Sequence, residues 1–349
     1  MNTRSLDSNL MTSRRVAYVP FEDVGNAYTV RMRKLLSEYG QVARFEGAKR
    51  AILRLASLQW WRYDSIVVNW AENDIIDRAT HRVSLFNVAK LFAKTLVMRL
   101  TSRRMVYVRH NKYPHATARG EEQRAQRWIA RYERLFDVVL SHSGAEVEGG
   151  VRQYCPHPLY ERLGSANAAP ALPALLEDLP AEYFVVFGRI LPYKRIEELV
   201  DAFPADRHLV VIGPVGNEEY GQRLAARQRA NFSFRPGYLS EQDAQAIVSR
   251  SAGVLISHAD ADVVVSGTFF YSMSLLVPVL AVATPFLEWV APRVGSELLT
   301  VARDVPELCA KLAQHQRQPV PPEVARRVDE EFGDRAVSNA LRAAIGDRA

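Results

Sequence analysis

Long hydrophobic runs, a signal sequence and abundant cysteine are all missing from this chain of 349 residues. No apolar stretch approaches the roughly 20 residues that span a bilayer, and the polar segment from Met1 to Arg15 lacks the apolar core of a signal peptide. The two cysteines, Cys155 and Cys309, have no metal-binding spacing, and so few thiols are typical of a reducing compartment. We therefore expect a cytoplasmic protein with buried thiols and no membrane-spanning segment.

Acidic residues are scarce in one part of the chain. Between His81 and Arg134 there are thirteen Lys and Arg residues but only three Glu and no Asp. A basic face of this kind attracts anionic lipid, polyphosphate or nucleic acid. Because no nucleic-acid-binding motif or aromatic ladder accompanies the charge, the sequence favours lipid and predicts no nucleic-acid partner.

Apolar runs alternate with amphipathic stretches along the whole chain. Strands are predicted at residues 14–20, 42–45, 65–70, 105–110 and 137–141, with helices at 27–39, 81–100 and 120–135. Further strands are predicted at 184–187, 208–212, 232–235, 253–256, 278–282 and 298–301. This alternation is typical of parallel α/β sheets with right-handed crossovers.

The length and the breaks in this pattern predict two domains. We expect a first domain at residues 1–160, an Ala- and Pro-rich linker at 161–180 and a second domain at 181–320. The final segment, 321–349, contains a predicted helix from Glu323 to Ile345 that is long enough to cross back onto the first domain.

Two cations follow the first strand of the second half. The buried run Phe184–Phe187 leads into Gly188, and Arg189 and Lys194 come next, before a helical pattern begins. Doubly wound sheets bind ligands beyond the carboxyl ends of their strands. A planar guanidinium and a compact ammonium together suit a diphosphate. Taken alone, the pattern favours a solvated basic loop, because charged residues are common in such loops.

A second candidate anion site lies at Ser266, Gly267 and Thr268, which precede a helical stretch. The free N–H groups of a helix start and its positive dipole end bind anions without a charged side chain, and glycine allows close approach. The alternative is that Ser266 or Thr268 only caps the helix. Together with Arg189 and Lys194, the anion site becomes the favoured interpretation.

Several motifs resemble those of one enzyme family. They are Gly188-Arg189 with Lys194, Gly237-Tyr-Leu-Ser240, Ser266-Gly-Thr268, Val277-Pro-Val-Leu-Ala281, Asn26-Ala-Tyr-Thr29, Asn69-Trp-Ala-Glu72, His110-Asn111, Pro114-His115 and His157-Pro-Leu-Tyr160. Over nearly the whole chain they resemble GT-B glycosyltransferases, in particular the bacterial exopolysaccharide branch with the xanthan-type β-mannosyltransferase. The resemblance implies an α/β fold of two Rossmann-like domains facing each other across a cleft. It places the diphosphate at the two anion sites and the nucleobase near Gly237, Tyr238 and Leu239.

The chain departs from the retaining pattern of the large GT-B family four. That family carries two glutamates where Val263 and Tyr271 stand here, and the second would hold the nucleotide ribose. Their loss disfavours retention, and it leaves ribose recognition at Tyr271 open. Inversion needs a base on the acceptor side, in the first domain.

Three candidates for this base lie at predicted strand ends: Glu72, His110 and Asp23. A carboxylate near apolar surface can have a raised pKa suited to a general base, although Glu72 could equally support a helix dipole. His110 could be the base or only bind a sugar hydroxyl. The resemblance implies acceptor contacts at Asn26, Tyr28, Trp70, Asn111 and His115.

Asp260 and Asp262 resemble the metal-binding Asp-x-Asp of the other glycosyltransferase fold. Because cations and a helix start already serve the diphosphate here, we interpret both as loop acids and predict no metal and no cofactor.

The resemblance implies an inverting glycosyltransferase that moves a hexose from GDP-mannose or a UDP-sugar to a polyprenyl-diphosphate-linked oligosaccharide in exopolysaccharide biosynthesis. The basic residues Lys90, Lys94, Arg103 and Arg104 predict peripheral binding to the anionic inner face of the cytoplasmic membrane. The alternatives are a nucleotide-sugar epimerase or hydrolase, a retaining family-four-like glycosyltransferase, or a non-catalytic nucleotide-sugar binding protein.

Overall fold

The computed structural model describes residues 14–22, 26–57, 61–114, 117–147, 152–162, 179–227, 229–258 and 264–346. The chain divides into two compact units. The N-terminal unit comprises Met1–Pro158, Asp262–Val264 and Asp334–Ala349, and the C-terminal unit comprises Leu159–Ala261 and Val265–Gly333. Asp23, His115, Asp260, Asp262 and Val263, and most of the predicted linker, lie outside the described residues.

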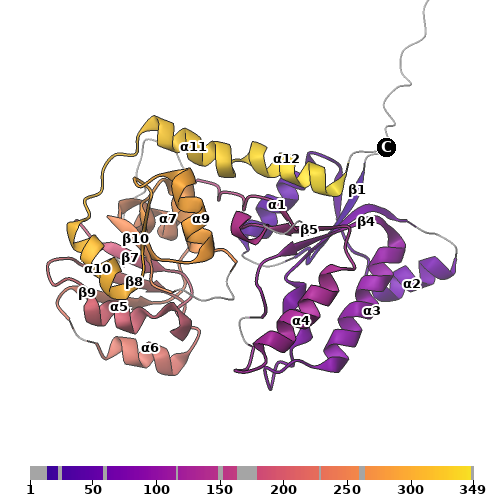
Figure 1. The fold of residues 1–349 in the computed structure, drawn as a ribbon, viewed down its shortest axis with the longest axis horizontal. Helices are drawn as coiled ribbons and strands as arrows, with labels where there is room; N and C mark the ends of the chain where they lie inside the picture. Colours follow the sequence, from indigo (N-terminus) through magenta and orange to yellow (C-terminus); the bar gives the residue numbers. More distant parts are fainter. Residues whose placement is uncertain are drawn as a thin grey trace, which may run out of the picture. The chain divides into compact units, whose positions relative to one another are not determined.

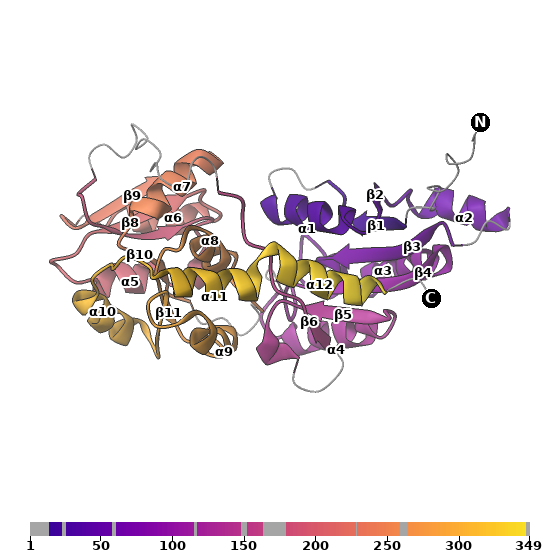
Figure 2. The same cartoon turned by 90° about the horizontal axis from the view of Figure 1, so that it is seen from above.

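The N-terminal unit is built on a parallel six-stranded sheet in the order β2-β1-β3-β4-β5-β6. Its strands are β1 (Arg15–Val19), β2 (Gln41–Arg44), β3 (Tyr63–Asn69), β4 (Ser102–Arg109), β5 (Val138–Ser141) and β6 (Arg152–Tyr154). One face is covered by α1 (Ala27–Ser37) and α12 (Asp334–Ile345). The other is covered by η1 (Ala71–Ile75) and by α2 (Ala48–Ala56), α3 (Leu85–Thr101) and α4 (Glu122–Glu133). Figures 1 and 2 label these three α-helices.

The C-terminal unit repeats this plan with the order β12-β11-β10-β7-β8-β9. Its strands are β7 (Phe184–Phe187), β8 (Leu209–Gly213), β9 (Phe232–Pro236), β10 (Gly253–Ile256), β11 (Val279–Val282) and β12 (Leu299–Ala302). One face packs against α5 (Ile196–Ala202), α6 (Glu218–Ala225) and α10 (Val305–Gln314). The other packs against α7 (Glu241–Arg250), α8 (Gly267–Leu275), α9 (Pro285–Val294) and α11 (Pro322–Phe332). Continuous apolar runs form these strands because both faces are buried.

Some elements differ from the predictions. The helix predicted from His81 begins at Leu85, because Ser84 accepts the Asn87 N–H as its N-cap and residues 76 and 83 form an antiparallel bridge before it. The helix α2 and the three-residue strand β6 were not predicted. The single helix predicted from Glu323 to Ile345 is two helices, which are separated at Gly333.

The two final helices belong to different units. Val324, Val328 and Phe332 of α11 join the core of the C-terminal unit. Val337 and Leu341 of α12 join the core of the N-terminal unit, where the Ser65 hydroxyl donates to the Ile345 carbonyl at 3.2 Å. Within the described residues, no helix is both long and apolar enough to cross a membrane.

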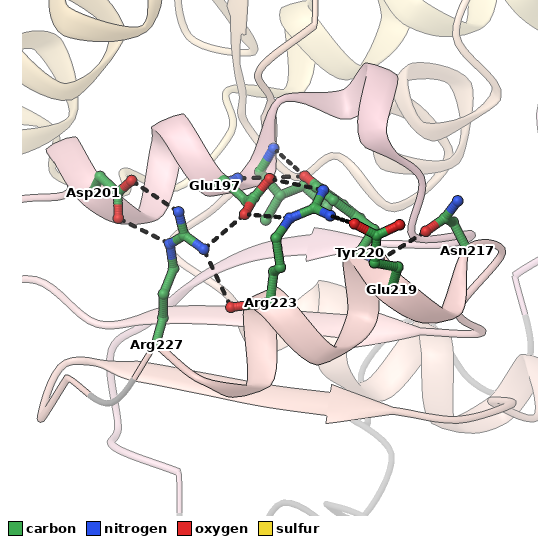
Figure 3. A network of polar contacts seen from close by, with 8 residues as sticks. Glu197, Asp201, Asn217, Glu219, Tyr220, Arg223 and Arg227 are labelled. Carbon is green, nitrogen blue, oxygen red and sulfur yellow. Dashed lines mark hydrogen bonds and ion pairs between the residues drawn. The ribbon is translucent and has the colours of Figure 1, made fainter.

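A network of ion pairs ties α5 to α6 on the surface of the C-terminal unit (Figure 3). Arg227 pairs with Glu197 at 2.7 Å and with Asp201 at 2.9 Å, and Arg223 reaches Glu197 at 3.2 Å. The hydroxyl of Tyr220 accepts the backbone N–H of Ile196 at 3.0 Å, which satisfies a free donor at the start of α5. The segment after β7 is thereby held to α6 beneath it.

Candidate functional site

A small pocket lies where the strand order of the C-terminal sheet reverses. The parallel strands β7 and β10 are neighbours, and the sheet continues from β7 to β8 and β9 on one side and from β10 to β11 and β12 on the other. Such a switch point opens a crevice at the carboxyl ends of the strands. The pocket brings Lys194, which follows β7, together with Thr268 of α8. Its lining residues are Val186, Phe187, Lys194, Leu255, Ile256, Ser257, His258 and Thr268.

Lys194 supplies the positive charge of this pocket. It is half-buried, its Nζ donates to the Phe187 carbonyl at 3.4 Å, and its own carbonyl accepts the Ser257 hydroxyl at 2.5 Å. Among the residues that the structure describes, no carboxylate pairs with it. Burial lowers the pKa of Lys194 to about 8, because desolvation disfavours the ammonium. A partly desolvated cation without a counter-ion favours an anionic ligand.

Two glycines shape the loop around Lys194. Gly188 has a φ of +90°, a conformation that side chains disfavour, and it turns the chain directly after β7. A Cβ at Gly213, at the end of β8, would lie 2.2 Å from the Gly188 carbonyl oxygen. The two strand ends can approach this closely only because Gly213 carries no side chain.

The start of α8 has the geometry predicted for an anion site. Ser266 occupies the N-cap position, but its side chain makes no capping hydrogen bond. The Phe269 N–H donates to the Ser266 carbonyl at 3.1 Å, but the N–H groups of Gly267 and Thr268 donate to no carbonyl of the described residues. Gly267 is exposed, and a Cβ there would lie 3.5 Å from the Tyr160 hydroxyl. The capping alternative for Ser266 therefore has no support in this geometry.

Arg189 is exposed and is not part of the pocket lining. Its Nε lies beside Gly216, where a Cβ would approach it to 2.8 Å. The described contacts therefore bring Lys194 and Thr268 together but leave Arg189 outside, and its role at the diphosphate stays a prediction.

The residues predicted to contact the nucleoside lie on the same unit. Tyr238 follows β9 with 88% of its side chain exposed, directly after Gly237, whose φ is +154°. Tyr271 is buried between the rings of Phe187 and Tyr160, with centroids at 4.9 and 5.3 Å. Its hydroxyl donates to Glu241 Oε1 at 2.9 Å. A carboxylate therefore stands next to Tyr271, although it comes from α7.

A cluster of rings lies at the carboxyl ends of the N-terminal strands. The His110 ring stacks on Trp70 with centroids 4.3 Å apart and contacts Tyr28 edge-on at 5.0 Å. His142 lies 5.4 Å from His110, and His157 lies 5.2 Å from His142. Tyr28, Trp70 and His110 were predicted as site residues; His142 and His157 were not. For His142 the sequence does contain an indication, because this residue directly follows the strand predicted at 137–141.

Hydrogen bonds fix the ring nitrogens of the two unpredicted histidines. The Nδ1–H of His142 donates to the Cys155 carbonyl at 2.7 Å, so its Nε2 accepts the Tyr28 hydroxyl at 2.8 Å. The Nδ1–H of His157 donates to the Pro158 carbonyl at 2.8 Å. Burial lowers the pKa of His142 to about 4 and that of His157 well below its usual range. Both imidazoles are therefore neutral at pH 7.

Glu72, the first candidate for the base, is fully buried. Its oxygens accept the Tyr107 hydroxyl at 2.7 Å and the Asn111 amide at 3.1 Å, and burial raises its pKa. Both oxygens are thus engaged with the protein and none of the side chain is exposed. His110 is half-buried, so this geometry favours His110 over Glu72 as the group that meets an acceptor.

Asn111 and Asn26 have structural contacts as well. Asn111 donates to Glu72, and Asn26 Oδ1 accepts the Thr29 N–H at 3.3 Å as the N-cap of α1. Across the described residues, no three His, Cys, Asp or Glu side chains are arranged to hold a metal ion.

No protein-family model and no curated protein matches the sequence. Solved structures are nevertheless similar in fold. Anabaena HepE in complex with UDP and glucose is 13% identical with a TM-score of 0.62, over 94% of this chain and 98% of that one. AviGT4, a glycosyltransferase involved in avilamycin A biosynthesis, is 12% identical with a TM-score of 0.56, over 95% and 97%. A putative UDP-N-acetylglucosamine 2-epimerase from Listeria monocytogenes is 13% identical with a TM-score of 0.51, over 95% of each.

These likenesses extend over nearly the whole chain and confirm the predicted fold class. The chain has two Rossmann-like domains of the GT-B type, each with a parallel six-stranded sheet. At these identities the likeness concerns the fold alone.

Proposed function

We propose that the protein is a glycosyltransferase that uses a nucleotide-diphosphate sugar as donor. The observation that carries this proposal is the pocket at the switch point, which is lined both by Lys194, an ammonium without a carboxylate partner among the described residues, and by Thr268 at the start of α8. The fold is that of HepE, which was solved with UDP and glucose, and of the glycosyltransferase AviGT4.

In the proposed reaction, the C-terminal unit stabilises the leaving group. Negative charge grows on the diphosphate as the bond to the sugar breaks, and Lys194 with the N–H groups of α8 stabilises that charge without a metal ion. A base of the N-terminal unit, His110 or Glu72, takes the proton of the acceptor hydroxyl. Tyr271 at a glutamate position of the retaining pattern makes inversion the simpler path.

The nucleoside is assigned to the segment after β9, to the start of α7 and to Tyr271 of α8. The exposed ring of Tyr238 offers a face for stacking of the base. Glu241, whose Oε1 accepts the Tyr271 hydroxyl, offers its other oxygen, Oε2, to the ribose diol. In this assignment Tyr271 contributes by holding a carboxylate that the neighbouring helix supplies.

The acceptor is proposed to be a polyprenyl-diphosphate-linked oligosaccharide of exopolysaccharide assembly. The likeness to a putative epimerase supports a second candidate, a nucleotide-sugar epimerase. Incubation of the purified protein with UDP- and GDP-sugars, with and without lipid-linked acceptor, distinguishes the two. Transfer that depends on acceptor supports the proposal, whereas epimerised or hydrolysed donor in its absence contradicts it. The anomeric proton of the product, assigned by NMR, decides between inversion and retention.

Replacing Lys194 with methionine is expected to weaken nucleoside diphosphate binding by about 10- to 150-fold. The variant removes a charge-assisted hydrogen bond worth about 1.5–3 kcal/mol while keeping most of the side-chain volume. Wild-type affinity is also expected to fall as pH rises through about 8, where the Lys194 ammonium loses its proton. Calorimetric titration with UDP and GDP in the presence of EDTA measures both effects.

Lys311→Met is the matched control, because Lys311 also donates to a backbone carbonyl, that of Val301, at 2.6 Å. It should bind nucleotide as the wild type does. Equal affinity of the Lys194 variant and the wild type, or binding that needs Mg²⁺ or Mn²⁺, would contradict the assignment.

We also propose that the N-terminal unit binds anionic membrane through α2 and α3. The exposed side of α3 carries Phe86, Ala89, Ala93, Leu96 and Leu100 at helical spacing. The adjacent helix α2 buries only Ala51 and exposes its aliphatic and basic side chains together. These exposed residues are Lys49, Arg50, Ile52 and Leu53.

The basic residues predicted for this surface differ in how far their charged groups are already engaged with other parts of the protein. Lys90 is exposed, and the guanidinium of Arg103 lies 5.7 Å from the ring centroid of the exposed Trp61. Lys94 lies 3.9 Å from Asp74, and Arg104 donates to the Ala344 carbonyl at 2.6 Å. The proposed membrane surface therefore depends more on α2, Lys90 and Arg103 than on Lys94 or Arg104.

Neutralising Lys49 and Arg50 to glutamine is expected to weaken binding to anionic vesicles by about 30-fold, since each basic residue near such a surface contributes about 1 kcal/mol. Ile52→Ser with Leu53→Ser should weaken it further by removing the inserted apolar side chains. Co-sedimentation with phosphatidylglycerol vesicles gives the partition coefficients. Val30→Ser, on α1 at 54% exposure, is the control that should leave them unchanged. Binding that is indifferent to lipid charge and to salt would overturn the proposal.

A further inference from the structure

We propose that Asn69 is a positioning residue that holds the His110 ring in one tautomer, with the Nδ1 lone pair directed to the acceptor hydroxyl. The inference deepens the proposed function, because it assigns which atom of His110 receives the proton. It rests on hydrogen-bond orientation at the ends of β3 and β4.

The orientation of the Asn69 amide follows from its two contacts. Asn69 is the last residue of β3 and is buried, and its Nδ2 donates to the Val19 carbonyl at 3.3 Å. Because a carbonyl oxygen only accepts, the amide nitrogen must face Val19, and the Oδ1 therefore faces His110. That oxygen lies 3.2 Å from His110 Nε2.

The same reasoning assigns the proton on His110. Asn69 Oδ1 can only accept, so His110 Nε2 carries the hydrogen, and in a neutral ring Nδ1 then has the lone pair. Among the described residues, none donates to this Nδ1. The plane of the ring is held by the stack on Trp70 and the edge contact with Tyr28, so the direction of the lone pair is fixed as well.

The surroundings keep this ring neutral. The groups that face it are Tyr28 from α1, Asn69 and Trp70 at the end of β3, His142 after β5 and His157 after β6. In the part of the chain that the structure describes, no carboxylate contacts the ring. Burial, followed by the electrostatic influence of His142 and His157, lowers the pKa of His110 well below its usual range.

The step that this geometry serves is a single displacement. The acceptor oxygen forms its bond to the anomeric carbon as its proton passes to His110 Nδ1. The bond from that carbon to the nucleoside diphosphate breaks, and the leaving oxygen takes the electron pair. The imidazolium then returns its proton to water.

The tautomer can be tested without any substrate. Long-range ¹H–¹⁵N spectra of the ¹⁵N-histidine-labelled full chain, with His110 assigned from the His110→Gln variant, should show an unprotonated Nδ1 and a protonated Nε2 at pH 7.5. In Asn69→Leu, which lacks the acceptor, the two tautomers should mix. A protonated Nδ1 in the wild type would overturn the proposal.

Kinetics test the consequence for transfer. Asn69→Asp keeps an acceptor for Nε2–H but loses the donor to Val19, whereas Asn69→Leu loses both, so comparing them isolates the contact with His110. Asn69→Leu should lower kcat at least tenfold with the donor KM unchanged. Asn69→Asp should retain more activity. The acidic limb of its pH–rate profile should move to higher pH, because a carboxylate beside the ring favours the imidazolium.

Identical pH–rate profiles in the wild type and both variants would overturn the positioning role. If the wild type carries the expected tautomer but transfers no sugar from any donor, the proposed function fails while the tautomer assignment stands.

Discussion

Turnover is expected to fall by about 10²–10⁴-fold when His110 is replaced by glutamine, the range that general base catalysis typically contributes. Glutamine can still hydrogen-bond Asn69 but cannot accept a proton at pH 7. Because the donor pocket of the C-terminal unit is untouched, nucleotide affinity should not change. Steady-state kinetics with calorimetric titration of nucleotide separate the two effects.

Glu72→Gln is the rival variant, and it should act differently. Its carboxylate accepts from both Tyr107 and Asn111, and an amide at this buried site can accept from only one of them. The main expected effect is therefore on stability, measured by urea unfolding. His208→Gln, a histidine of the C-terminal unit that bonds Ser233 at 2.9 Å, is the control for turnover. A loss of kcat in Glu72→Gln alone, with His110→Gln active, would make Glu72 the base.

Acid is expected to destabilise the N-terminal unit well above the pH at which carboxylates titrate. His110, His142 and His157 are neutral in the fold because burial lowers their pKa values, that of His142 to about 4, whereas an unfolded histidine titrates near pH 6.5. Between these values the unfolded chain binds the proton and the folded chain does not. Stability is therefore complete above pH 6.5 and falls as the pH drops, by about 1.4 kcal/mol per pH unit for each histidine.

Urea unfolding at pH 7, 6 and 5 measures this slope. His142→Gln is expected to lower this slope by about 1.4 kcal/mol per pH unit, since the variant removes one of the three neutral histidines. An unfolding free energy that stays constant from pH 7 to pH 5 would show that the imidazoles are protonated within the fold.

The sheets could be predicted from the sequence because their strands are buried on both faces, which leaves apolar runs such as Phe184–Phe187 and Val254–Ile256. The helix α2 escaped prediction because it buries only Ala51, so it has no apolar stripe that faces the core. The break at Gly333 was missed because apolar periodicity continues on both sides of it. Periodicity shows which positions are buried, but not which core they join.

The candidate site was predictable where it depends on one loop, as with Lys194 after β7 or Ser266 at the start of α8. It was not predictable where distant segments meet. Tyr271 and Glu241 come from different helices, and His142 joins His110 only because β4 and β5 are neighbours in the sheet. A sequence pattern within one segment cannot predict contacts between segments that are distant in the chain.

The position of α12 has a consequence for biosynthesis. Val337, Leu341, Ala344 and Ile345 belong to the same core as Val16, Tyr18 and Val67, which the ribosome makes some three hundred residues earlier. Domains usually fold in the order in which they emerge. Here the N-terminal sheet leaves the ribosome first yet lacks one covering helix until the whole C-terminal unit has been made. During that interval its α12-facing apolar surface stays uncovered, and the C-terminal unit is the first that can complete its core.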